Sequence, residues 1–290
     1  MRKEKTTSLV LNDPIEKGVL REAAGLLKKE IEAEQDLCQV FNDKNNLIIF
    51  ITYTSTNYGK SDFSQIEKKN ARFEIENLDG GYSIRRPDNE QTDVYLGSLL
   101  SKIEHLEKER VAAEGEDSSK LKLNVDEISL ENVEDNEKRT DFFTRLISEL
   151  EGYVLDDVTD AYVYHPKNEV IADEDGDSTT GVHISKASLK GEGVLKSGEL
   201  ISLYERGFYI WKIRWRVKDK TRDPDIYEFE AQFDNPLDFN GFSYISRGVK
   251  KFKSGGKYNK NSVQLNDSQE LMFNRLIEKA ARSIIIDLNR

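Results

Sequence analysis

Residues 209–217 read YIWKIRWRV and residues 227–233 read YEFEAQF, and these two stretches decide how the second half of the chain folds. Side chains alternate across a β-strand, so each stretch carries its aromatic and aliphatic residues on one face and its polar residues on the other. When the two strands fold together about the loop 223–225, basic side chains meet acidic or amide ones. The predicted pairs are Arg216 with Glu228, Arg214 with Glu230 and Lys212 with Gln232. We therefore expect an antiparallel hairpin whose apolar face, Trp211 and Trp215 included, covers the core.

The chain around this hairpin predicts more strands and a closing helix. Strands are expected over 153–164, 182–189 and 200–204, after a short helix over 142–150. A second hairpin is expected between 242–252 and 258–265, about the Ser-Gly-Gly turn at 254–256. The residues DSQE at 267–270 are typical of a capping box, so the final helix should begin there. Its predicted core-facing residues are Leu271, Leu276, Ala280, Ile284 and Leu288.

The first half of the chain mixes helices and strands. Asp13 and Pro14 are typical of a helix start, and the apolar spacing that follows predicts one long helix whose buried stripe reaches Cys38. An apolar run predicts a buried strand over 47–54, and the stretches 72–76 and 82–85 predict a hairpin about Gly80. Thr92 is expected to cap a second helix that ends near position 111.

Together these elements predict an α+β protein with an N-terminal α/β unit, followed by a mostly antiparallel β-rich unit with a C-terminal helix. The expected division is an α/β domain over 1–112, an acidic linker or loop over 113–138, and a β-rich domain over 139–290. The linker is placed where the composition shifts to acidic and small polar residues.

Composition bounds the class of protein. The chain has 290 residues, a formal net charge of -11 and a single cysteine, which excludes an internal disulfide and favours a reducing compartment. We find neither a signal-peptide core nor a stretch long and apolar enough to span a bilayer. The sequence therefore predicts a soluble cytoplasmic protein without a membrane partner.

The negative charge is concentrated in the middle of the chain, where residues 111–200 carry about -13 and residues 201–290 about +5. Asp173, Asp175 and Asp177 alternate within this acidic stretch. They resemble half of a calcium loop, but Ser178 stands where the turn glycine is needed and Ile184 where the bidentate glutamate is needed. We therefore expect these aspartates to bind a protein partner with a basic surface, with a homo-oligomer as a further possibility.

A second candidate interface is basic. Cations mix with aromatic residues over 242–260 without an intervening acid, as in segments that attract phosphate and stack on bases. The cations are Arg247, Lys250, Lys251, Lys253, Lys257 and Lys260. Lysines at an exposed hairpin also prevent strands from pairing with other chains, so nucleic-acid binding or processing is the alternative function rather than the first one.

No complete catalytic motif is present. Lys60 and Ser61 end a stretch that resembles a phosphate-binding loop, but Thr54 occupies the position of its first glycine. His105, His165 and His183 fall in no motif that pairs a base with a nucleophile. The prediction is thus a non-enzymatic binding protein with a regulatory or inhibitory role toward another macromolecule, without catalytic, cofactor-binding or metal-binding residues.

Overall fold

The computed structural model describes residues 4–43, 46–56, 65–115, 117–166 and 186–290, and the chain divides into two compact units, 1–127 and 128–290. This boundary falls inside the segment that composition marks as the linker. The elements of the first unit are β1 (Thr6–Leu11), α1 (Lys17–Ala33), β2 (Leu37–Asp43), β3 (Asn46–Thr56), β4 (Ile66–Leu78), β5 (Gly81–Pro87), α2 (Glu90–Ala113) and β6 (Val125–Glu127).

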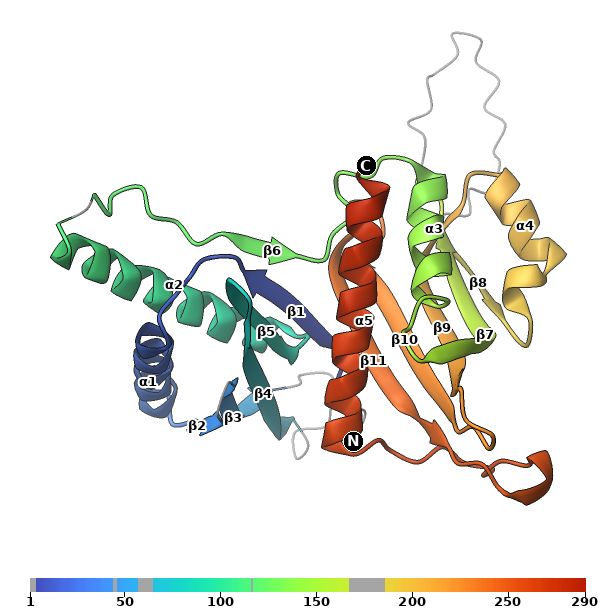
Figure 1. Cartoon of the computed structure of the whole chain (residues 1–290), viewed down its shortest axis with the longest axis horizontal. Helices are drawn as coiled ribbons and strands as arrows, with labels where there is room; N and C mark the ends of the chain where they lie inside the picture. The colour runs from blue at the N-terminus through green and yellow to red at the C-terminus, as the bar shows by residue number, and fades with distance from the viewer. Residues whose placement is uncertain (1–3, 44–45, 57–64, 116, 167–185) are drawn as a thin grey trace, which may run out of the picture. The chain divides into compact units, whose positions relative to one another are not determined.

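The first unit is an antiparallel sheet with two helices on one face. Its strands run in the order β2-β3-β4-β5-β1, and β6 also pairs with β1. Figure 1 shows α1 and α2 on the same side of these strands. Alternate residues of β3, such as Ile49 and Ile51, face the helices and are buried with Leu27 of α1 and Leu99 of α2. The predicted strand over 47–54 and the predicted hairpin about Gly80 are confirmed.

The first helix is shorter than its apolar spacing predicts. It begins at Lys17, and Glu16 rather than Asp13 is its N-cap residue. It ends at Ala33, where the backbone N–H of Asp36 bonds to the carbonyl of Ile31 and Gln35 adopts a left-handed φ of 69°. This turn reverses the chain into β2, so Cys38 lies on a strand and not on the helical stripe.

The second helix begins before its predicted cap. Asn89 is the N-cap residue, and its side chain accepts a hydrogen bond from the backbone N–H of Thr92 at 3.1 Å. Thr92 is fully buried in the first turn, and its hydroxyl donates to the carbonyl of Pro87 at 2.6 Å. Both residues stabilise the start of the helix, but Asn89 holds the capping position.

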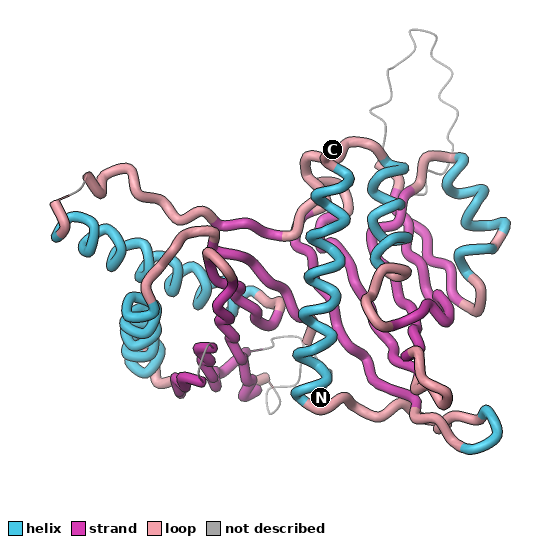
Figure 2. Tube along the Cα trace, in the orientation of Figure 1, coloured by secondary structure: helices cyan, strands magenta, loops and turns pink. Residues whose placement is uncertain are grey.

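The second unit is an antiparallel sheet in the order β11-β10-β9-β7-β8. Helices α3 and α5 lie side by side across one face of it, as Figures 1 and 2 show. Its elements are α3 (Asn136–Leu146), β7 (Tyr153–Tyr164), β8 (Lys186–Lys190), a 3-10 turn (Val194–Lys196), α4 (Gly198–Glu205), β9 (Tyr209–Asp219), β10 (Ile226–Asn235), β11 (Asn240–Lys250), a 3-10 turn (Ser254–Gly256) and α5 (Asp267–Leu288). The α+β class and the C-terminal helix are as predicted.

Aromatic rings dominate the core of this unit. Phe142 and Phe143 of α3 lie 5.4 and 5.8 Å, centroid to centroid, from Phe233 of β10, and Phe273 of α5 lies 4.8 Å from Phe229. The rings are tilted or edge-on, which is the favourable arrangement for aromatic pairs. This packing joins both helices to the apolar face of the sheet.

Two predicted segments of this unit differ in detail. Residues 200–204 form part of α4 and not a strand, because Ser197 caps a helix by accepting from the N–H of Leu200 and the apolar residues follow at helical spacing. The capping box of α5 is formed by Asn266 and Gln269, one residue earlier than predicted. The buried face of α5 includes Phe273 and Ile277 in place of Leu271 and Leu276, which are partly exposed.

The hairpin that decides the fold has the predicted register. Arg216 lies opposite Glu228, Arg214 opposite Glu230 and Lys212 opposite Gln232. Trp215 is fully buried, with its ring 5.5 Å from that of Phe229 across the strand pair. Trp211 also packs against the core but is less buried: the β7–β9 register shifts beside it, and its half-buried ring lies 6.3 Å from that of Tyr162. The extra residue breaks the alternation, so Trp211 is only partly buried where Trp215 is fully buried.

Truncation of the two tryptophans compares a fully buried ring with a partly buried one. We expect Trp215→Ala to lower the free energy of unfolding by about 3–5 kcal/mol, because a large buried ring leaves a cavity. Trp211→Ala should lower the free energy of unfolding by about half as much or less, since the ring of Trp211 is partly exposed to solvent. Urea unfolding followed by circular dichroism measures both. Equal losses would contradict the register described for Trp211.

Candidate functional site

The polar face of β9 and β10 carries a buried carboxylate surrounded by cations. Glu230 is 2% exposed, and its oxygens lie 2.8 Å from Lys212 Nζ, 2.8 Å from Arg214 Nη2 and 3.0 Å from Arg247 Nη1. Burial by itself would raise the pKa of Glu230, but the hydrogen bonds and charges of Lys212 and Arg214 outweigh it and lower the pKa to about 2. Glu230 is therefore ionised at neutral pH and is a weaker base than an ordinary carboxylate.

Carboxylates of β7 neutralise the remaining cations of β9. The ion pairs are Arg214 with Asp160 at 3.3 Å, Arg216 with Asp157 at 3.3 Å, and Lys218 with Asp156 at 2.6 Å. The sequence did not indicate these partners, because the β7 register shifts between Leu155 and Asp157 and again between Val158 and Asp160, which hides the alternation. The basic stripe of β9 is thus a structural feature of the sheet, with its charges matched inside the fold.

The predicted basic segment, 242–260, begins within β11 and continues as a hairpin over 250–260, which we call the basic hairpin. Phe252 and Tyr258 bridge across it, with their ring centroids 5.7 Å apart. Gly255 and Gly256 turn the chain with φ of 72° and 73°, values that a residue with a Cβ rarely adopts. The Oδ1 atom of Asp225 anchors the hairpin by accepting a hydrogen bond from the N–H of Phe252 at 2.8 Å.

The six predicted cations of this segment divide into two groups. Arg247 pairs with Glu230, and Lys251 Nζ lies 2.7 Å from Asp225. The other four are Lys250, Lys253, Lys257 and Lys260, none of which has an ion-pair partner among the described residues. Lys253, Lys257 and Lys260 are exposed and Lys250 is half-buried. Because Phe252 and Tyr258 are partly buried against each other, the basic hairpin offers positive charge rather than a surface for base stacking.

The predicted acidic site lies outside the described residues. Asp173, Asp175 and Asp177 fall within 167–185, as does His183. Lys60 and Ser61 fall within 57–64, which is also not described. The structure therefore places no partner-binding geometry on these positions.

The remaining candidate groups have local roles. The Nε2 atom of His105 lies 3.4 Å from Glu109 on the exposed side of α2, and the ring of His165 lies 5.1 Å from that of Phe208. Burial raises the pKa of the Cys38 thiol to about 11, which leaves it protonated and unreactive at neutral pH. Across the described ranges, His, Cys, Asp and Glu side chains do not gather in threes as they would around a metal ion.

Comparison of the chain with models of protein families, with curated proteins and with solved structures gives no match. Within the part of the chain that the structure describes, no helix has the length and apolar character needed to cross a membrane.

Glu230 with Lys212, Arg214 and Arg247, here called the Glu230 cluster, should make the free energy of unfolding depend on pH under acidic conditions. Since the folded-state pKa of Glu230 is about 2, below its ordinary value of 4.5, its ionised form stabilises the fold above pH 4.5. This contribution is lost as the pH falls from about 4.5 to 2. Glu230→Gln should lower the free energy of unfolding by about 3–5 kcal/mol at pH 7 and flatten the pH dependence in that window.

Glu228→Gln is the matched control, because Glu228 lies on the same strand but is more exposed and sits 3.9 Å from Arg247. Glu228→Gln should lower the free energy of unfolding by about 1 kcal/mol or less. Denaturant unfolding at a series of pH values compares the two variants. A Glu230→Gln protein as stable as the parent would show that the cluster does not hold the sheet.

Proposed function

We propose that the protein is a non-enzymatic binding protein with a regulatory or inhibitory role toward another macromolecule, and that nucleic acid contacts its basic hairpin. The supporting observation is a contrast within the second unit. The cations on β9 are matched by nearby carboxylates, whereas four lysines of the basic hairpin have no partner among the described residues. In a chain of net charge -11, such a local excess of positive charge favours a polyanion as the partner.

The kind of binding follows from the side chains available. Lysine is a flexible point charge, and it contacts phosphate oxygens without reading base identity. The aromatic rings of the hairpin are partly buried, which weakens the case for base stacking as a source of sequence preference. We therefore propose electrostatic, sequence-tolerant binding that weakens as salt is added.

Replacing three exposed lysines tests this function. Lys253→Ser, Lys257→Ser and Lys260→Ser combined should weaken binding to a duplex of about 20 base pairs by at least tenfold at low salt. The slope of log K against log salt should become shallower by roughly 3, because about one counterion is released for each phosphate contact. Fluorescence anisotropy with labelled duplex and single-stranded DNA or RNA measures both quantities.

The matched control removes the same charge elsewhere, with Lys29→Ser, Lys120→Ser and Lys196→Ser, all of which are exposed. Binding by the control should change little. If both triple variants lose affinity equally, the hairpin is not the interface. If the unsubstituted protein binds no nucleic acid, the nucleic-acid proposal fails.

A partner with a basic surface remains the prediction for the acidic segment. Should that segment serve recognition, replacing Asp173, Asp175 and Asp177 by Asn should slow association with a protein co-purified from the native cell. The effect should be largest at low salt, since the screening length is about 8 Å at physiological ionic strength. Surface plasmon resonance measures the association rate. An unchanged rate and affinity would contradict a role for these aspartates in recognition.

A further inference from the structure

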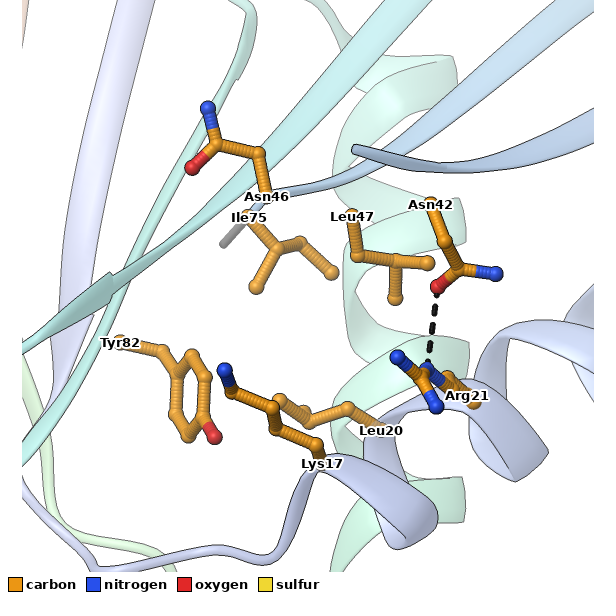
Figure 3. Close-up of a pocket in the computed structure, with 8 residues that line it drawn as sticks. All are labelled: Lys17, Leu20, Arg21, Asn42, Asn46, Leu47, Ile75 and Tyr82. Atoms are coloured by element: carbon orange, nitrogen blue, oxygen red, sulfur yellow. Dashed lines mark hydrogen bonds between the residues drawn. The ribbon is translucent and has the colours of Figure 1, made fainter. Parts of the chain in front are cut away.

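The first unit contains a pocket of about 210 Å³ that the proposed function does not use. It lies between α1 and the strands β2 to β5, and Figure 3 shows its side chains. The lining residues are Lys17, Leu20, Arg21, Asn42, Asn46, Leu47, Ile75 and Tyr82. They divide into an apolar floor and a polar rim, and none of them is acidic.

The floor is apolar and buried. Leu20 is 3% exposed, Leu47 7% and Ile75 1%. Tyr82 adds its ring, while its hydroxyl donates to the carbonyl of Ile15 at 3.0 Å and so has its hydrogen committed within the fold. A ligand in this pocket would therefore meet hydrocarbon at the bottom, where a short alkyl chain or a single ring would be removed from water.

The rim presents hydrogen-bond donors and positive charge. Lys17 and Arg21 lie one helical turn apart on α1, so their side chains project from the same face. Arg21 donates through Nε to Asn42 Oδ1 at 3.2 Å, which uses the amide oxygen of Asn42 and leaves the Nη groups of Arg21 as donors. Figure 3 shows Lys17 reaching across the pocket toward Tyr82, and its ammonium group has no partner among the described residues.

Helix polarity adds to this charge. Lys17 is the first residue of α1, and no side chain caps this end of the helix or places an acid in its first turn. The N-terminus of a helix carries a partial positive charge, so the Lys17 ammonium adds to a local potential that already favours an anion. The N-cap residue Glu16 makes no side-chain capping bond and does not line the pocket, so the two cations of the rim favour an anionic ligand there.

We infer that this pocket binds a small amphiphilic anion, a carboxylate joined to a short alkyl chain or to one ring. The carboxylate would accept hydrogen bonds from Lys17 and Arg21, and the apolar part would lie on Leu20, Leu47 and Ile75. The volume is below the roughly 300–1,000 Å³ typical of sites for drug-sized ligands, which limits the tail to a few carbon atoms. This site lies in the first unit and does not depend on the basic hairpin.

Isothermal titration calorimetry on the full chain tests the inference with four probes: hexanoate, benzoate, hexylamine and inorganic phosphate. Hexanoate or benzoate should bind, because each offers both a carboxylate and an apolar part. Hexylamine has as many carbon atoms as hexanoate but the opposite charge and should not bind, and phosphate, which lacks a tail, should bind at least tenfold more weakly than the better carboxylate.

Charge removal at the rim provides the second measurement. Lys17→Ala with Arg21→Ala should weaken carboxylate binding at least tenfold, and both side chains are exposed, so the fold should survive. The control is Lys28→Ala with Lys29→Ala, which removes the same charge from the same helix outside the pocket and should leave binding unchanged. Absence of carboxylate binding at about 10 mM, or equal binding of hexylamine and hexanoate, would overturn the inference.

Discussion

The Glu230 carboxylate is almost completely buried, and it can remain charged there because three cations from neighbouring strands surround it. A buried charge without partners destabilises a fold strongly, so strands that carry Glu230 must also bring Lys212, Arg214 and Arg247 to the same face. A one-residue slip of β10 would turn Glu230 toward the aromatic core and expose Phe229 and Phe233 to water. The electrostatic requirement on one face and the hydrophobic requirement on the other therefore select the same register.

The same network changes how the positive charges of the chain are to be understood. β9 looks basic in the sequence because it carries Lys212, Arg214, Arg216 and Lys218, but these cations are matched by carboxylates of β7 and β10. Sequence patterning identified the cations at 247–260 but not their division into paired and unpaired groups. Arg247 and Lys251 are paired through side chains that are distant in sequence, and such pairing depends on tertiary contacts that no local pattern encodes. The pocket at Lys17 could not be predicted either, because it is assembled from α1 and four strands.

Local rules predicted the fold where residue periodicity and packing agree, as in the β9–β10 hairpin and the strand predicted over 47–54, which is β3. These rules failed where one residue changes the course of the backbone and its residue type does not signal the change in the sequence. Gln35 ends α1 in a left-handed conformation that glycine usually adopts, so apolar spacing alone carried the predicted helix on to Cys38. The register shift beside Trp211 likewise has no glycine or proline to mark it.

The single cysteine and the two tryptophans fall in different units, with Cys38 in the first and Trp211 and Trp215 in the second. Cys38 is buried, and its raised pKa keeps the thiol from reacting until the first unit opens. Indole emission, in contrast, reports on the second unit. The natural sequence thus contains a chemical probe of one unit and an optical probe of the other, with no label or substitution needed. Coincident transitions from thiol alkylation and fluorescence would mean that the units unfold as one cooperative system, and separate transitions would give each unit its own stability.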